Sequence, residues 1–162
     1  MTSDAPDKIE TYEAMLNRAM WYLGRRDYGA RELRQKLLRQ RQGKPSPGEA
    51  VCEQVIARLL ELGYLDDARY AQRLAESLSN KGYGARAVAC ELRRRGIEEE
   101  AEPPVEDAER LADLLQTKYA ARLGDERGQR AVYQALLRKG FSYADVRSAM
   151  RDYMEEADFD AD

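Results

Sequence analysis

Apolar residues recur along the chain at the spacing of α-helices. They return every three or four positions, so each set lies on one face of a helix with 3.6 residues per turn. No segment sustains the alternation of apolar and polar residues that a half-buried strand shows. The pattern therefore predicts an all-α protein. The clearest apolar faces are Tyr12, Leu16, Ala19 and Leu23; Ala30, Leu33 and Leu37; Val51, Val55, Leu59 and Leu62; Tyr70, Leu74 and Leu78; Ala108, Leu111, Leu115 and Tyr119; and Val146, Met150 and Tyr153.

Glycines mark the ends of these predicted helices. Several stand just after an apolar segment, where a left-handed residue ends a helix at low steric cost. Helix starts are marked by Asp66 and Ser142, which are expected to cap the helices that follow them. Pro103 and Pro104 are expected to shorten or remove any helix over residues 98–105. The glycines at predicted helix ends are Gly24, Gly43, Gly63, Gly82, Gly96, Gly124 and Gly140.

The chain also contains an internal repeat. The tetrapeptide Tyr-Gly-Ala-Arg at residues 28–31 recurs unchanged at residues 83–86, and matching apolar and arginine positions follow both copies. A weaker third copy begins at Gly128. The copies are unequally spaced, which is unlike a regular solenoid. Since short helices are marginal alone, the pattern predicts three units of about three helices that are stabilised by packing on one another.

One segment carries a family resemblance. Residues 62–71, Leu-Gly-Tyr-Leu-Asp-Asp-Ala-Arg-Tyr-Ala, resemble a signature of the RecX regulatory proteins. Residues 26–37 are similar to the first-repeat pattern of that family, and residues 82–97 match it downstream. The resemblance covers roughly residues 11–154. The loop Gln42–Glu49 departs from it by being longer and richer in proline and glycine than expected.

The resemblance implies an architecture and boundaries for its parts. We expect three tandem three-helix repeats in an elongated, curved array. The expected parts are a flexible N-terminus at residues 1–10, repeats at 11–63, 64–105 and 106–154, and a frayed acidic tail at 155–162.

The resemblance also implies a function without catalysis. RecX proteins bind the filament of the RecA recombinase and restrain its ATP hydrolysis, strand exchange and co-protease activity. We therefore expect a regulator of recombination, DNA repair and the SOS response, with no catalytic residues and no cofactor. A cytoplasmic monomer is the expected form.

Composition agrees with a non-catalytic role. The sequence has no histidine, which excludes histidine-based metal sites, triads and imidazole acid–base chemistry. Cys52 and Cys90 are isolated, so they are expected to be small buried residues in a reducing compartment. Asp66 and Asp67 are adjacent acids, but helix capping explains them better than catalysis. No run approaches the ~18 apolar residues of a membrane span, so no membrane partner is expected.

Charge is distributed in blocks, although the formal net charge is only −3. Basic residues dominate segments 8–41, 81–96 and 118–151, whereas acidic residues dominate 97–113 and 152–162. A single arginine is most simply a solvated side chain, but three basic blocks on one repeated element suggest a shared partner. The alternative to RecA is direct DNA binding through the same faces, and weak contact with single- or double-stranded DNA is compatible with both readings. The candidate contact residues are Arg25, Arg26, Arg31, Arg34, Arg86, Arg93, Arg94, Arg95, Arg130, Arg138, Lys139, Tyr28 and Tyr83.

Aromatic residues divide into expected core and expected interface. Trp21 is expected to be buried. Tyr22, Tyr28 and Tyr83 have no obvious place in a core and are candidates for an interface. The tyrosines expected in the core are Tyr12, Tyr64, Tyr70, Tyr119 and Tyr153.

Overall fold

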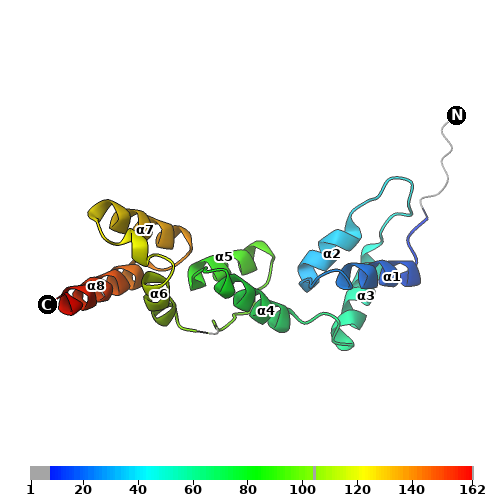
Figure 1. The fold of residues 1–162 in the computed structure, drawn as a ribbon. Helices are drawn as coiled ribbons and strands as arrows, with labels where there is room; N and C mark the ends of the chain where they lie inside the picture. Colours follow the sequence, from blue (N-terminus) through cyan, green and yellow to red (C-terminus); the bar gives the residue numbers. More distant parts are fainter. Residues whose placement is uncertain (1–7, 104, 162) are drawn as a thin grey trace. The chain divides into compact units, whose positions relative to one another are not determined.

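The structure is a computed structural model that describes residues 8–103 and 105–161. Within these residues it consists of helices and loops, and the β-type pairing is a single bridge between Ile9 and Ser46, so the predicted all-α class is confirmed. Figure 1 follows the helices in chain order. They are α1 (Tyr12–Leu23), α2 (Ala30–Leu38), α3 (Glu49–Glu61), α4 (Asp67–Asn80), α5 (Ala85–Arg94), α6 (Asp107–Gln116), the 3₁₀ helix η1 (Ala120–Arg122), α7 (Glu126–Arg138) and α8 (Tyr143–Asp160).

Most helix boundaries follow from local chemistry. Asp66 accepts a hydrogen bond from the Arg69 N–H at 3.0 Å, and the Ser142 hydroxyl accepts one from Asp145 N–H at 3.1 Å, so both predicted caps are confirmed. Five of the seven glycines expected to end helices have positive φ, namely Gly43, Gly63, Gly82, Gly96 and Gly140, although Gly43 lies in the loop beyond the end of α2 at Leu38. The expected left-handed conformation is wrong for Gly24 and Gly124, although Gly24 does end α1 as its C-cap residue. Gly24 has φ −70°, a right-handed conformation that any residue adopts.

The contacts divide the chain into two compact units. The first comprises the described residues up to Tyr70 together with Arg94–Glu99. The second comprises Ala71–Arg93 together with the residues from Glu100 onward. The division falls within α4 and at the end of α5, so the second sequence repeat contributes to both units.

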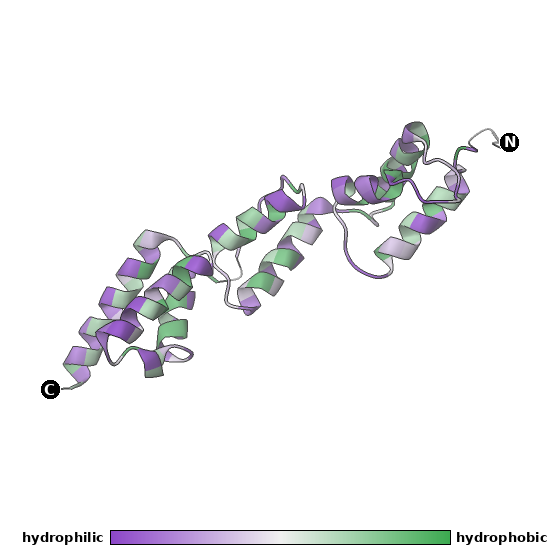
Figure 2. Cartoon of the chain, turned by 90° about the horizontal axis from the view of Figure 1, so that it is seen from above, coloured by the Kyte–Doolittle hydropathy of each residue, from purple (hydrophilic) through white to green (hydrophobic). Residues whose placement is uncertain are grey.

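The first unit has a core between α1, α2 and α3. Met15, Leu33, Leu37 and Leu59 are fully buried there. Figure 2 shows hydrophobic and hydrophilic positions alternating along these helices, as expected for helices with one apolar face. Burying such side chains stabilises the unit by about 1.5–3 kcal/mol each.

The second unit has its own core between α6, η1, α7 and α8. Its largest fully buried residue is Phe141, which follows Gly140 and packs with Leu111, Leu136 and Val146. This placement confirms that Gly140 ends α7 and turns the next apolar residue back toward the helix.

The two ends of the chain differ from expectation. The N-terminal segment is not loose at residues 8–10, because Ser46 N–H donates to the Lys8 carbonyl and Glu10 N–H donates to the Ser46 carbonyl, both at 2.9 Å. Residues 1–7 lie outside the described residues. The expected frayed tail is instead helical to Asp160. From Glu155 onward it contains no glycine or proline that would end α8.

The second repeat has lost its third helix, as the prolines predict. Residues 97–103 contain no helix, and the chain is next helical at α6. Pro103 is described, whereas Pro104 lies outside the described residues. Ile97 is nevertheless buried, so this stretch still contributes an apolar contact.

Several burial predictions are wrong. Trp21 is 56% exposed and Tyr64 is 52% exposed. Cys52 is buried but Cys90 is exposed. Tyr28, expected at an interface, is 7% exposed and packs edge-to-face with Tyr22 at 5.9 Å between ring centroids. Tyr70 and Tyr119 are buried as expected, and Tyr12 and Tyr153 are partly buried against the two cores.

Candidate interaction surface

The repeated tetrapeptide starts a helix that a distant aspartate caps. Ala30 N–H, in the first turn of α2, donates to Asp67 Oδ1 at 2.9 Å. Ala85 N–H, in the first turn of α5, donates to Asp107 Oδ2 at 3.0 Å. Both aspartates begin the helix of the following repeat, α4 or α6. The tetrapeptide is thus one half of a contact between successive repeats.

The glycine of the tetrapeptide allows a close approach. A Cβ on Gly29 would lie 3.2 Å from Ile97 Cγ1, and one on Gly84 would lie 2.6 Å from the Gly140 carbonyl oxygen. Backbone bonds hold the second contact, because Gly84 N–H donates to the Lys139 carbonyl at 2.8 Å. The third copy differs, since Gly128 lies inside α7 and does not precede it. The repeated tetrapeptide is therefore explained first by packing within the protein, before any contact with a partner.

The second unit contains a basic hollow formed by α5 and the end of α7. Its volume is about 880 Å³. Arg86, Cys90 and Arg93 line it from one face of α5, at positions i, i+4 and i+7. Arg138 lines it from the end of α7, and Tyr83 from the turn before α5. We call this site the basic groove. It brings together four of the candidate contact residues.

The arginines of the basic groove are available to a partner. Within the part of the chain that the structure describes, none of Arg86, Arg93 and Arg138 forms an ion pair. All three are exposed. Lys139 Nζ lies 4.3 Å from the ring centroid of Tyr83, so a fifth candidate residue contacts the groove wall. The lining of the groove therefore carries three arginines against one carboxylate, that of Glu91.

The candidate arginines of the first unit are largely engaged within the unit. Arg26 pairs with Glu32 at 2.6 Å, and its guanidinium lies 3.7 Å from the Tyr28 ring centroid. Arg34 pairs with Glu53. Hydrogen bonding to these glutamates raises the pKa of Arg26 and of Arg34. These pairs stabilise the charged forms and leave less of each guanidinium for a partner.

Other candidate residues are scattered. Arg31 is exposed and packs its aliphatic part on Gly96, where an added Cβ would meet Arg31 Cδ at 2.6 Å. Arg95 donates a hydrogen bond to the Tyr70 hydroxyl, and Arg94 also interacts with another group of the protein. Arg130 forms an exposed pair with Glu126 at 3.4 Å. The structure does not gather these side chains into the basic groove.

A further exposed feature lies at the end of α1, where the candidate residue Arg25 meets Trp21, which was expected to be buried. The Arg25 guanidinium lies 4.3 Å from the centroid of the Trp21 ring, and Trp21 also packs edge-to-face with Tyr22 at 5.2 Å. Met20 beside it is 36% exposed. Tryptophan and arginine are the residue types most enriched at protein–protein contact centres. The spacing of Trp21 and Arg25, four residues apart, was the signal available in the sequence.

The long-range caps were not predicted from the sequence. Helix capping was expected of Asp66 and Asp67 at the start of their own helix, and no role was expected for Asp107. A comparison of Asp66-Asp67-Ala68 with Glu106-Asp107-Ala108 would have linked the two, since each acidic pair stands at the start of a helix that follows a repeat. Burial raises the pKa of Asp67, against the opposing effect of the hydrogen bond from Ala30.

Known proteins resemble this chain over most of its length. The family model described as RecX, second three-helix domain, matches residues 66–101. The regulatory protein RecX of Serratia proteamaculans (strain 568) is 32% identical over 165 residues, which cover 87% of this chain and 98% of the relative. This chain belongs to the RecX family. The regulatory protein RecX of Escherichia coli (strain SE11) is 31% identical, with 94% of this chain and 99% of the relative covered.

Solved RecX structures share the fold. A crystal structure of RecX from Lactobacillus salivarius aligns with a TM-score of 0.66 at 22% identity, covering 87% of this chain and 95% of that one. A second, described as regulatory protein RecX, aligns with a TM-score of 0.63 at 19% identity and covers 87% and 73%. These likenesses confirm the predicted helical-repeat fold class.

Family membership confirms that the chain is a regulatory protein and not an enzyme, because the RecX relatives are named as regulators. Among the residues described here, no helix is both long and apolar enough to cross a membrane.

Proposed function

We propose that this protein binds the RecA recombinase filament and inhibits its ATPase, strand-exchange and co-protease activities. It would thereby modulate recombination, DNA repair and the SOS response. The observation that supports this proposal most is the similarity to RecX regulatory proteins over nearly the whole of both chains. The basic groove adds a surface suited to carboxylates or phosphates, because guanidinium groups bind both in a bidentate fashion.

Inhibition of this kind needs no chemistry from the bound protein. A ligand that prefers an inactive or disassembled filament shifts the population toward that state by the difference between its two affinities. The arginines of the basic groove in the second unit and the exposed Trp21 of the first supply two separate contact surfaces. Each can favour one filament state through its own contacts.

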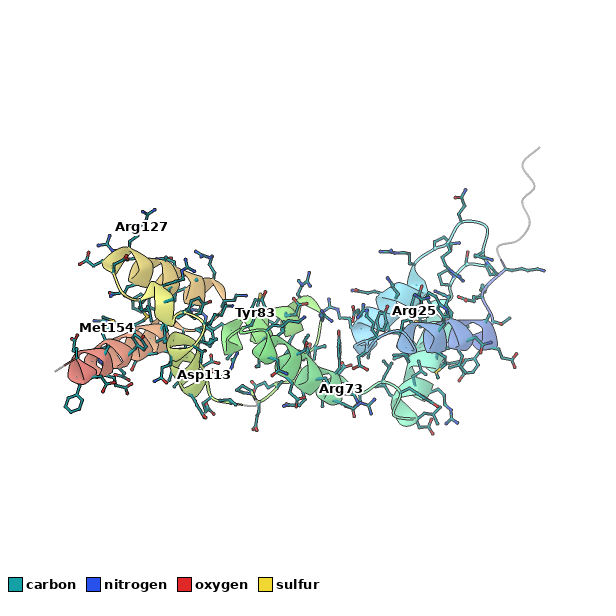
Figure 3. All side chains as sticks on the ribbon, viewed as in Figure 1. Arg25, Arg73, Tyr83, Asp113, Arg127 and Met154 are labelled. Carbon is teal, nitrogen blue, oxygen red and sulfur yellow. The ribbon has the colours of Figure 1, made fainter. Side chains whose placement is uncertain are left out.

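The test is ATP hydrolysis by RecA from the same organism on single-stranded DNA. We expect the rate to fall as this protein is added up to the concentration of RecA. The variant carrying Arg86→Glu and Arg138→Glu should inhibit less. Arg127→Glu is the matched control, because Arg127 is an exposed arginine near the start of α7, away from Arg138 at the end of that helix (Figure 3). An unchanged rate at stoichiometric wild-type protein would refute the proposal.

Direct DNA binding is the second candidate, and the unpaired arginines of the basic groove favour it. The separating measurement is a salt titration of DNA binding without RecA. Each phosphate neutralised on duplex DNA contributes a slope of about −0.9 to log K against log salt. Tight binding with a steep slope favours a DNA-binding protein, whereas negligible binding at low salt favours a protein partner.

A further inference from the structure

The basic groove combines positive charge with apolar surface. Three arginines line it, and so do the side chains of Leu78, Ala87 and Leu137. An anion alone would be met by charged and polar groups and would gain nothing from leucines. A ligand that fills this site well therefore has both negative charge and at least one apolar group.

The size of the groove limits what can fill it. About 880 Å³ is within the range of sites that hold a compact ligand or a few amino-acid side chains. Proteins that hold single-stranded nucleic acid combine a positively charged path with several aromatic stacking surfaces. Here Tyr83 is the aromatic residue of the lining, and Lys139 lies over its ring at 4.3 Å. One tyrosine does not provide the several stacking surfaces that such a strand uses.

We propose that the basic groove binds an acidic peptide segment of a partner protein, in which carboxylates flank an apolar side chain. The carboxylates are received by Arg86, Arg93 and Arg138, and the apolar side chain packs on Leu78 and Leu137. Arginine suits this role because its planar fork binds a carboxylate through two parallel hydrogen bonds. The inference deepens the proposed function and rests on it only for the identity of the partner.

The basic groove contains a cysteine whose alkylation reports whether a ligand is bound. Cys90 is exposed and lines the groove, whereas Cys52, the other cysteine of the sequence, is buried and has a pKa raised by burial. Since the thiolate is the reactive form, an alkylating reagent modifies Cys90 first. A ligand seated between Arg86 and Arg93 covers Cys90, which lies between them on α5, and slows this modification.

The experiment screens the full-length protein against an array of short synthetic peptides. In each, aspartates and glutamates surround one leucine or phenylalanine at a different spacing. Neutral counterparts carry asparagine and glutamine instead, and polar counterparts carry serine in place of the apolar residue. The strongest peptide is then tested for protection of Cys90 from iodoacetamide, with a single-stranded oligonucleotide as the competing ligand.

We expect acidic peptides with an apolar residue to bind, and to slow alkylation of Cys90. Arg86→Glu with Arg138→Glu should weaken peptide binding by about tenfold or more, whereas Arg127→Glu should leave it unchanged. Arg86→Gln with Arg138→Gln should also weaken it, which keeps the test valid if charge reversal disturbs folding. Far-ultraviolet circular dichroism reports the fold of each variant.

Three results would overturn the inference. One is an array in which acidic peptides bind no better than neutral ones. Another is protection of Cys90 by the oligonucleotide but by no peptide. The third is peptide binding that survives both arginine replacements. None of these assays contains RecA, so peptide binding without inhibition of RecA would refute only the proposed function, and inhibition without peptide binding would refute only this inference.

Discussion

The carboxylate of Asp67 caps α2 by accepting a hydrogen bond at 2.9 Å from Ala30 N–H, 37 residues earlier in the chain. The N-cap residue of α2 is Gly29, which has no side chain to cap the helix. The N–H groups in the first turn of a helix need outside acceptors. Gly29 therefore has two roles. Its lack of a Cβ makes room for Ile97. Its lack of a capping side chain leaves the Ala30 N–H to be capped by Asp67 of the next repeat.

Replacing Asp67 should change how stability depends on pH. Burial raises the pKa of Asp67 above its ordinary value near 3.8. The folded state therefore holds a proton that the unfolded state has already released, and this contribution to stability is lost as pH rises through the folded pKa. Asp67→Asn should remove that loss. The melting temperature should therefore fall less between acidic and neutral pH in this variant than in the wild type.

The matched variant Asp67→Ala separates the charge from the cap. Asparagine keeps an oxygen that can accept from Ala30 N–H, whereas alanine does not. At neutral pH we expect Asp67→Ala to lower the free energy of unfolding by about 1 kcal/mol relative to Asp67→Asn. Equal stability of the two variants would show that this cap contributes nothing.

The two glycines of the repeated tetrapeptide should differ in their tolerance of a methyl group. In Gly84→Ala the new Cβ meets the backbone of Gly140 and Phe141 at 2.6–2.7 Å, which cannot shift without moving the start of α8 and a core residue. In Gly29→Ala it meets the Ile97 side chain at 3.2 Å, which can rotate. We expect Gly84→Ala to destabilise by about 1–3 kcal/mol and Gly29→Ala by less. Chemical denaturation followed by circular dichroism gives both values, and the reverse order would contradict this account.

The sequence was sufficient for the helices and insufficient for the relations between them. Periodicity and caps predicted the helical class, the starts at Asp66 and Ser142, and the missing helix before Asp107. These features depend on residues within a few positions of one another. The roles of Asp67 and Asp107 depend on partners from an earlier repeat, which local pattern does not specify.

The same limit applies to the candidate site. Charge blocks pointed to arginines in all three repeats, but they did not distinguish Arg34, which pairs with Glu53, from Arg93, which lines the basic groove. Tyr28 and Tyr83 occupy identical positions in identical tetrapeptides. Only the packing around them makes the first a core residue and the second part of a groove wall.

The ion pair between Glu10 and Arg18 should be essential to the first unit. Glu10 is 3% exposed and receives two hydrogen bonds from Arg18, which also donates to the Leu37 carbonyl at 2.8 Å. Glu10→Ala leaves the guanidinium buried without its carboxylate and should cost about 3 kcal/mol or more. Glu53→Ala breaks the exposed pair with Arg34 and should destabilise the protein far less, because solvent screens that pair. Urea unfolding compares the two, and similar losses would mean that burial does not set the strength of the first pair.

Trp21 should be dispensable for folding but important for the partner. It is 56% exposed, and it is the one tryptophan of the sequence, so its fluorescence should be strongly quenched by iodide in the free protein and less so when RecA filaments are added. Trp21→Ala should change the free energy of unfolding by less than about 1 kcal/mol, because removing a half-exposed side chain opens little space in the core.

The same variant should weaken inhibition of RecA. At a protein contact, loss of a central tryptophan costs about 2 kcal/mol or more, so we expect the concentration for half-inhibition of RecA to rise by at least tenfold, which is about 1.4 kcal/mol. Phe159→Ala is the control, since Phe159 is an 85% exposed aromatic near the end of α8, and it should inhibit like the wild type. If Trp21→Ala also inhibits like the wild type, the exposed face of α1 does not contact the filament.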